Sequence, residues 1–191
     1  MQRRPLAAGL GALTVLLVLA APATGLRFGM PDAGNGSSDL TSRRAYDLTR
    51  EGFGPGANGP LLVAVDLRSG AAGTDAGAAR AVDRIADDLQ ATDGVAAVLP
   101  AALNDAGDAA VLTVVPRTGP QDEATERLVH TLRDEVLPGA VAGTGAEASV
   151  GGNTAAFIDD SEDTASRLPL LIGGVVLLSF LLLLTVFRSL A

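Results

Sequence analysis

Carboxylates are the side chains of this chain that could hold a cation or pass a proton, and several gather before its last apolar stretch. Asp159, Asp160, Glu162 and Asp163 lie within five residues of one another. Carboxylate oxygens are cation ligands, so a cation-binding or proton-entry role is one interpretation. The favoured interpretation is a solvated, acidic beginning of a helix that keeps this side of the chain out of the cytoplasm.

Histidine and cysteine restrict the metal and nucleophile chemistry. There is no Cys, which excludes a disulfide framework, a thiolate zinc site and a cysteine nucleophile. The single histidine, His130, leaves no room for a His-rich metal site, and it lies off the apolar face of its expected helix, so we expect it on the surface. Ser37 and Ser38 form no recognisable triad with it. We therefore predict no metal site, no cofactor, no catalytic residue and no enzyme activity.

Two further motifs have a functional and a structural interpretation. Residues 52–59 are rich in glycine and could cradle a phosphate, but no GK[ST] follows and the segment precedes a strand instead of a helix. We expect a structural loop there. Arg43 and Arg44, beside Tyr46, could meet an anionic lipid headgroup, although a solvated helix face is the favoured interpretation. Substrate-binding residues stay unknown at this stage.

Two apolar stretches are long enough to cross a bilayer. Residues 168–187 contain no charge, and fifteen of the twenty are Leu, Ile, Val or Phe. At ~1.5 Å per residue, this length matches a hydrocarbon core of about 30 Å. Residues 6–23 are also uncharged but rich in Ala and Gly. They predict either a retained transmembrane helix or a cleaved secretory signal ending at Ala21-Pro22-Ala23, and both place the next segment outside.

The distribution of arginine predicts the topology. All fourteen basic residues are arginine, and Arg3, Arg4 and Arg188 flank the apolar stretches. The positive-inside rule therefore places both chain ends in the cytoplasm and residues 25–167 on the extracytoplasmic side of the cell membrane. Setting these three arginines aside lowers the net charge from −8 to −11 for the segment between. We expect no nucleic-acid partner, because an acidic surface repels phosphates.

Between the apolar stretches, the pattern alternates between strands and helices. The expected strands are 61–67, 95–99, 109–115 and 146–150. The expected helices are 39–51, capped by Ser38 or Asp39, then 78–90, then one that begins at Pro120 and ends at Pro138-Gly139. From residue 61 on, the order β-α-β-β-α-β predicts a ferredoxin-like domain with both helices on one face of an antiparallel sheet, in an α+β membrane protein. The expected division is 1–24 helix, 25–60 loop and short helix, 61–152 domain, 153–167 connector and 168–188 second helix.

These segments together resemble a known family. The strongest stretches are 45–60 (AYDLTREGFGPGANGP), 151–160 (GGNTAAFIDD) and 187–190 (FRSL). In this order and spacing the chain resembles the MMPL family of membrane transporters, within the resistance-nodulation-division superfamily. Residues 26–35 (LRFGMPDAGN) look like the segment that enters the second extracytoplasmic domain of such transporters. The chain would then be a fragment with one leading helix, one porter domain and the start of the next helix.

The resemblance implies a function that the residues alone do not. Such transporters are driven by proton flow and export lipids or other hydrophobic compounds. The implied partners are the lipid bilayer, a hydrophobic or lipid substrate and the remainder of the transporter. Neither apolar stretch contains Asp, Glu, His, Lys or Arg, so no proton-coupling residue carries over. The alternative is a stand-alone, membrane-anchored extracytoplasmic binding or scaffold module, and a hydrolase is disfavoured because no catalytic constellation is present.

Overall fold

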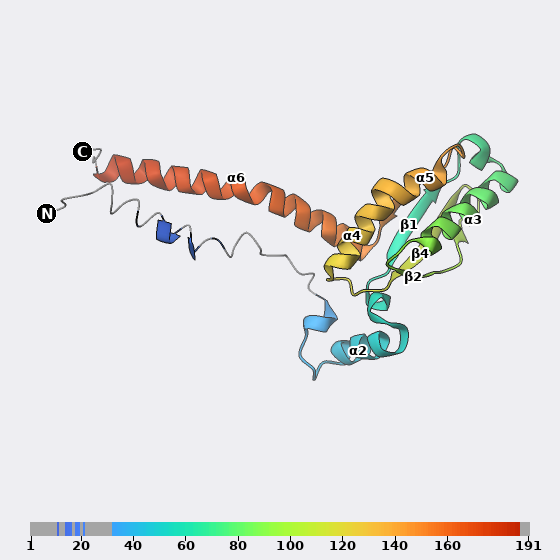
Figure 1. The fold of residues 1–191 in the computed structure, drawn as a ribbon, viewed down its shortest axis with the longest axis horizontal. Helices are drawn as coiled ribbons and strands as arrows, with labels where there is room; N and C mark the ends of the chain where they lie inside the picture. The colour runs from blue at the N-terminus through green and yellow to red at the C-terminus, as the bar shows by residue number, and fades with distance from the viewer. Residues whose placement is uncertain (1–10, 12–13, 17, 20, 22–31, 188–191) are drawn as a thin grey trace.

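The computed structural model describes residue 11, residues 14–16, 18–19 and 21, and residues 32–187. The predicted N-terminal span, 1–24, and the closing Arg188 therefore lie largely outside the described residues. The rest forms an antiparallel sheet with helices on one face, a small helical segment before it, and one long helix that extends away from it (Figure 1). The fold is thus of the expected mixed helix-and-sheet class.

The sheet has the spatial order β2-β4-β1-β5, and every pairing is antiparallel. A short strand, β3, also pairs with β4 and was not predicted. The strands are β1 (Leu61–Asp66), β2 (Val95–Val98), β3 (Ala102–Leu103), β4 (Ala109–Pro116) and β5 (Glu147–Gly151). The predicted strands are confirmed to within about one residue at each end, because alternating apolar residues and turn residues both mark them.

Alternation of side chains decides which face of the sheet is covered. In β1, Leu61, Val63 and Val65 are buried, whereas Leu62 and Ala64 are exposed. Val63 lies opposite Leu112 of β4 and Val150 of β5, which are buried too. Since residues in register share a face, the buried rows form one apolar layer beneath the helices.

The first covering helix, α3 (Asp75–Ala91), begins three residues earlier than predicted. Thr74 caps it, since its hydroxyl accepts a hydrogen bond of 3.1 Å from the backbone N–H of Gly77. Its apolar face includes Val82, Ile85 and Leu89, all of them buried against the sheet. The amphipathic pattern of this helix is therefore confirmed.

The second covering helix begins three residues after its predicted start at Pro120 and continues past its predicted stop at Pro138-Gly139, so both predicted ends were wrong. It comprises α4 (Glu123–Thr131), a π-helical turn η5 (Leu132–Val136) and α5 (Leu137–Val141). The N–H of Leu137 bonds to the carbonyl of Leu132, five residues back. A π turn changes the hydrogen-bond spacing locally, and Pro138 then takes a first-turn position of α5, where a missing N–H costs little.

The segment before the sheet also differs from prediction. Helix α2 (Thr41–Phe53) begins after Leu40, which makes no side-chain capping hydrogen bond, so the predicted caps Ser38 and Asp39 were wrong. The predicted irregular loop contains a 3-10 turn, η3 (Pro55–Asn58). Two other 3-10 turns are η2 (Ala33–Asn35) and η4 (Gly70–Gly73).

One helix, α6 (Asn153–Phe187), follows β5 almost directly. It runs without interruption through the residues expected to form a connector, 153–167, into the apolar stretch. Its first turns are anchored, because Thr154, Ala155 and Ile158 are buried against the domain. Within the described residues, it is the helix that is long and apolar enough to cross a membrane.

Candidate functional site

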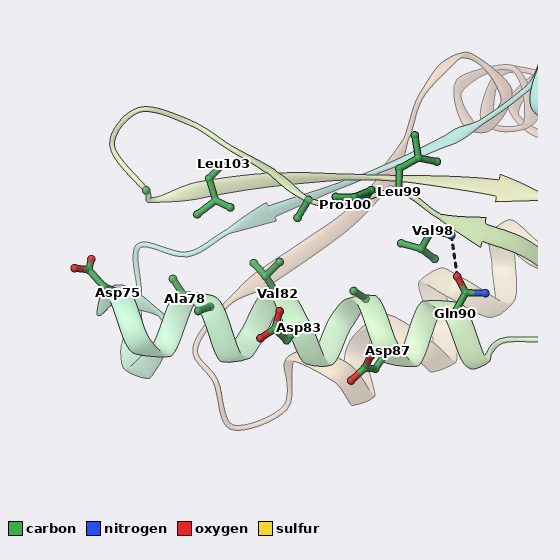
Figure 2. Close-up of a pocket in the computed structure, with 14 residues that line it drawn as sticks. Asp75, Ala78, Val82, Asp83, Asp87, Gln90, Val98, Leu99, Pro100 and Leu103 are labelled. Carbon is green, nitrogen blue, oxygen red and sulfur yellow. Dashed lines mark hydrogen bonds between the residues drawn. The ribbon is translucent and has the colours of Figure 1, made fainter.

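An apolar groove runs between α3 and the chain segment that joins β2 to β3 (Figure 2). Its volume is about 710 Å³, within the usual range of about 300–1,000 Å³ for small-molecule sites. Val82 of α3 and Leu103 of β3 face each other across it, and Leu99 lies on the strand side. Leu99 and Leu103 stay about half exposed, so the groove offers apolar surface to a ligand from solvent.

The margin of the groove is acidic. Asp75, Asp83 and Asp87 of α3 line it, and no basic residue among those described does. Gln90 closes one end, because its side-chain oxygen accepts a hydrogen bond of 3.0 Å from the N–H of Val98 (Figure 2). An apolar floor with carboxylates at its edge suits a neutral or cationic amphipathic molecule better than an anionic one.

A polar junction joins α4 and η5 to the N-terminal part of α6, where Figure 1 shows α4 and α6 meeting. His130 Nε2 lies 2.7 Å from Glu162 Oε1. Arg133 donates to both carboxylate oxygens of Asp159, at 2.5 and 3.0 Å, and also to the carbonyl of Val150 in β5, at 3.1 Å. The junction therefore links the sheet, its covering helix and the long helix.

The carboxylates of the acidic cluster 159–163 differ in their partners. Asp159 and Glu162 face α4 and η5, whereas Asp163 pairs with Arg167 within α6 at 2.8 Å. His130 lies at the junction with its side chain 42% exposed, so the expectation of a simple surface histidine was incomplete. Arg133 was not singled out from the sequence, because its partners lie 17 and 26 residues away along the chain.

Arg133 and Asp159 each stabilise the charged form of the other. The hydrogen bond from Arg133 lowers the pKa of Asp159 from its usual 3.8, although partial burial opposes this. The bond to Asp159 raises the pKa of Arg133, so the guanidinium stays charged. A carboxyl whose pKa is lower in the folded state stabilises the fold above its ordinary pKa and loses that contribution as the pH falls through the folded value.

We therefore expect Asp159→Asn to lower the unfolding temperature of the full chain in detergent at pH 7, and to have a smaller effect at pH 3. The free energy of unfolding should fall by about 1 kcal/mol or less at pH 7, because the carboxylate is half exposed. Circular dichroism during heating measures it. Asp160→Asn, one residue along the same helix, is the control. An equal effect of Asp159→Asn at the two pH values would contradict the expectation.

The glycine-rich segment 52–59 packs against its neighbours in the fold. Gly56 and Gly59 are buried, and a Cβ on Gly56 would meet the carbonyl oxygen of Pro116 rather than open space. The Thr154 hydroxyl donates to the carbonyl of Gly59 at 3.2 Å, so the loop joins the end of β4 to the start of α6. Carbonyl oxygens beside the loop do not favour a phosphate.

Arg43 is engaged inside its own segment. It pairs with Asp47 at 2.9 Å and donates to the carbonyl of Gly34 at 2.6 Å. Burial, together with nearby Asp32, raises the pKa of Tyr46. These contacts fit the structural interpretation for Arg43 and hold η2 against α2, whereas Arg44 is exposed.

Comparison with known proteins agrees with the resemblance seen in the sequence. The family model described as "MMPL family" matches residues 36–191. The membrane protein YdfJ of Bacillus subtilis is 37% identical over 188 residues, which is 98% of this chain and 25% of that protein. The mycolic acid-containing lipids exporter MmpL11 of Mycolicibacterium smegmatis is 32% identical over 187 residues, which is 98% of this chain and 19% of that protein.

Two further proteins are similar to this chain. A Mycobacterium tuberculosis relative at 32% identity is named heme uptake protein MmpL11. A solved structure, mycobacterial membrane protein MmpL11D2, is 21% identical with a TM-score of 0.32 and covers 48% of this chain and 99% of that one. The chain thus spans a quarter or less of the length of these curated relatives.

Proposed function

The chain belongs to the MMPL family, and on that premise we propose that it forms the extracytoplasmic porter domain of a transporter that exports lipids or other hydrophobic compounds, driven by the proton-motive force. The observation that carries the proposal is the direct continuation of β5 into α6. A folded domain joined to a long apolar helix by only one intervening residue can transmit movement between membrane and cargo site.

We assign the domain, residues 61–152, to the ferredoxin-like class. In support, its elements follow the order strand, helix, strand, strand, helix, strand once the two-residue β3 is set aside, and the strand order β2-β4-β1-β5 is antiparallel throughout. Residues 168–187 then cross the membrane, and residues 25–167 lie on the extracytoplasmic side. Residues 6–23 form either a retained transmembrane helix or a cleaved secretory signal. The arginines that flank the apolar stretches support this arrangement.

The groove along α3 is the cargo surface that we propose for this domain. The names of the relatives mention mycolic acid-containing lipids and heme, which are both large and mostly apolar. The apolar floor of the groove fits part of such a molecule, and its acidic margin disfavours an anionic headgroup there. The apolar span 168–187 contains no ionisable side chain, so proton coupling must come from elsewhere in the whole transporter.

A chimera tests this function. The matched stretch of the M. smegmatis exporter is replaced by this chain in cells that lack their own copy, and export of mycolic acid-containing lipids is measured. We expect export that stops when a protonophore collapses the proton gradient. Ala79→Trp, which fills the groove, should lower export, whereas Ala76→Trp, exposed on the same helix outside the groove, should not.

Two outcomes would count against the proposal. One is a chimera that reaches the membrane at normal abundance and exports nothing. The other is equal export by the Ala79→Trp and Ala76→Trp chimeras, which would leave the transporter assignment standing and remove the groove from it.

A further inference from the structure

We propose that Glu126, His130 and Glu162 form a binding site for one divalent transition-metal ion of the Zn²⁺ type, which fastens α4 to α6. One ligand atom from each of the three side chains lies within 4.8 Å of those of the other two. The site is separate from the groove, and the inference does not depend on the transport function.

The backbone brings these three side chains together from two parts of the chain. Glu126 and His130 are four residues apart on α4, so they lie on the same side of that helix. Glu162 comes from α6, 32 residues beyond His130. The position of α6 is fixed by the buried side chains of Ala155 and Ile158 and by the Arg133–Asp159 pair. The ligands therefore lie on two anchored helices.

The donor set selects the class of ion. One imidazole nitrogen and two carboxylate oxygens suit Zn²⁺ and similar transition metals, whereas Ca²⁺ and Mg²⁺ prefer oxygen alone. Zinc bonds of about 2.0–2.2 Å place ligand atoms around one ion roughly 3.5 Å apart, so only small side-chain rotations are needed. Two carboxylates balance the charge of the ion, and water would complete its coordination.

The surroundings permit such an ion to enter. Glu126 and His130 are partly exposed and Glu162 is exposed, so the site opens to solvent. Arg133 of η5 is already paired with Asp159, which limits its repulsion of a metal ion. His130 Nε2 and Glu162 Oε1 are 2.7 Å apart, and a bound ion would take the place of this direct hydrogen bond.

Titration of the full chain with Zn²⁺ alone tests the proposal. The chain is prepared in detergent without a histidine tag, and a chromophoric chelator competes for the ion. We expect one Zn²⁺ per chain and a Kd at least ~10-fold higher in His130→Gln and Glu162→Gln, since even outer-shell changes cost about 10–100-fold. The control variants are Asp163→Asn, next to Glu162 on α6, and Glu123→Gln, which lies on α4 and is paired with Arg127.

Two further measurements keep the test decisive if a variant is less stable. Far-UV circular dichroism without metal shows whether each variant is folded, and X-ray absorption reports the zinc ligands. Nitrogen and oxygen ligation that loses its imidazole component in His130→Gln supports the site. Absence of Zn²⁺ binding by the wild-type chain, or unchanged affinity in folded His130→Gln and Glu162→Gln, would overturn it.

Discussion

Replacing Gly56 by alanine is expected to lower the free energy of unfolding by about 3 kcal/mol or more. A Cβ on Gly56 would lie 1.8 Å from the carbonyl oxygen of Pro116 and 3.0 Å from that of Thr118. Neither oxygen is at the end of a flexible side chain. Pro116 is held by the pairing of β4 with β2, where it lies opposite Val95. The turn η3 would therefore have to move away from the sheet and lose its buried position.

Gly52 offers a matched control for this substitution. It lies inside α2, and a Cβ added there would have nothing within 4 Å, so Gly52→Ala should be neutral or stabilise the chain by up to ~1 kcal/mol. Unfolding of the full chain in detergent, followed by circular dichroism in denaturant, compares the two variants. Similar midpoints for Gly56→Ala and Gly52→Ala would contradict the close packing of the loop against β4.

The sheet and α3 could be predicted because their signals are local. Alternation in β1 and β4 and the apolar face of α3 each arise from neighbouring residues. The start of α2 could not be predicted, because Leu40 takes the cap position without a side-chain capping hydrogen bond. The continuation of the helix through Pro138 could not be predicted either, because proline ordinarily ends a helix. A π turn before Pro138 relieves the cost that would end an ordinary α-helix. The strand β3 is too short to leave a periodic pattern.

The polar junction was predictable only in part. The sequence shows the carboxylates of 159–163, but which of them face inward depends on the rotation of α6 about its axis. That rotation is set by Thr154, Ala155 and Ile158, which pack against the domain. His130 of α4 and Arg133 of η5 gain their partners only when α6 packs against these two elements. The groove likewise forms only where α3 and the segment 98–103 lie side by side. Local sequence patterns do not predict which segments lie next to each other in the fold.

The largest effect on membrane insertion is expected from Leu177→Arg, near the middle of the apolar stretch. The most apolar part of α6 is 0% buried within the described chain, so we expect lipid to cover these side chains. Leu at a helix centre favours insertion by about 0.3–0.6 kcal/mol and Arg opposes it by about 2.5–3.5, so the change should cost roughly 3–4 kcal/mol. An insertion assay with glycosylation sites on either side of α6 measures the inserted fraction.

Leu170→Arg is the control for position along the same stretch. It introduces the same charge near the outer end, where the long side chain can reach the interface and the cost is smaller. Insertion should therefore fall steeply for Leu177→Arg and modestly for Leu170→Arg. Equal inserted fractions for the two variants would show that residues 168–187 do not cross the bilayer with Leu177 near its centre. The β5–α6 connection would then lose its role in linking the domain to the membrane.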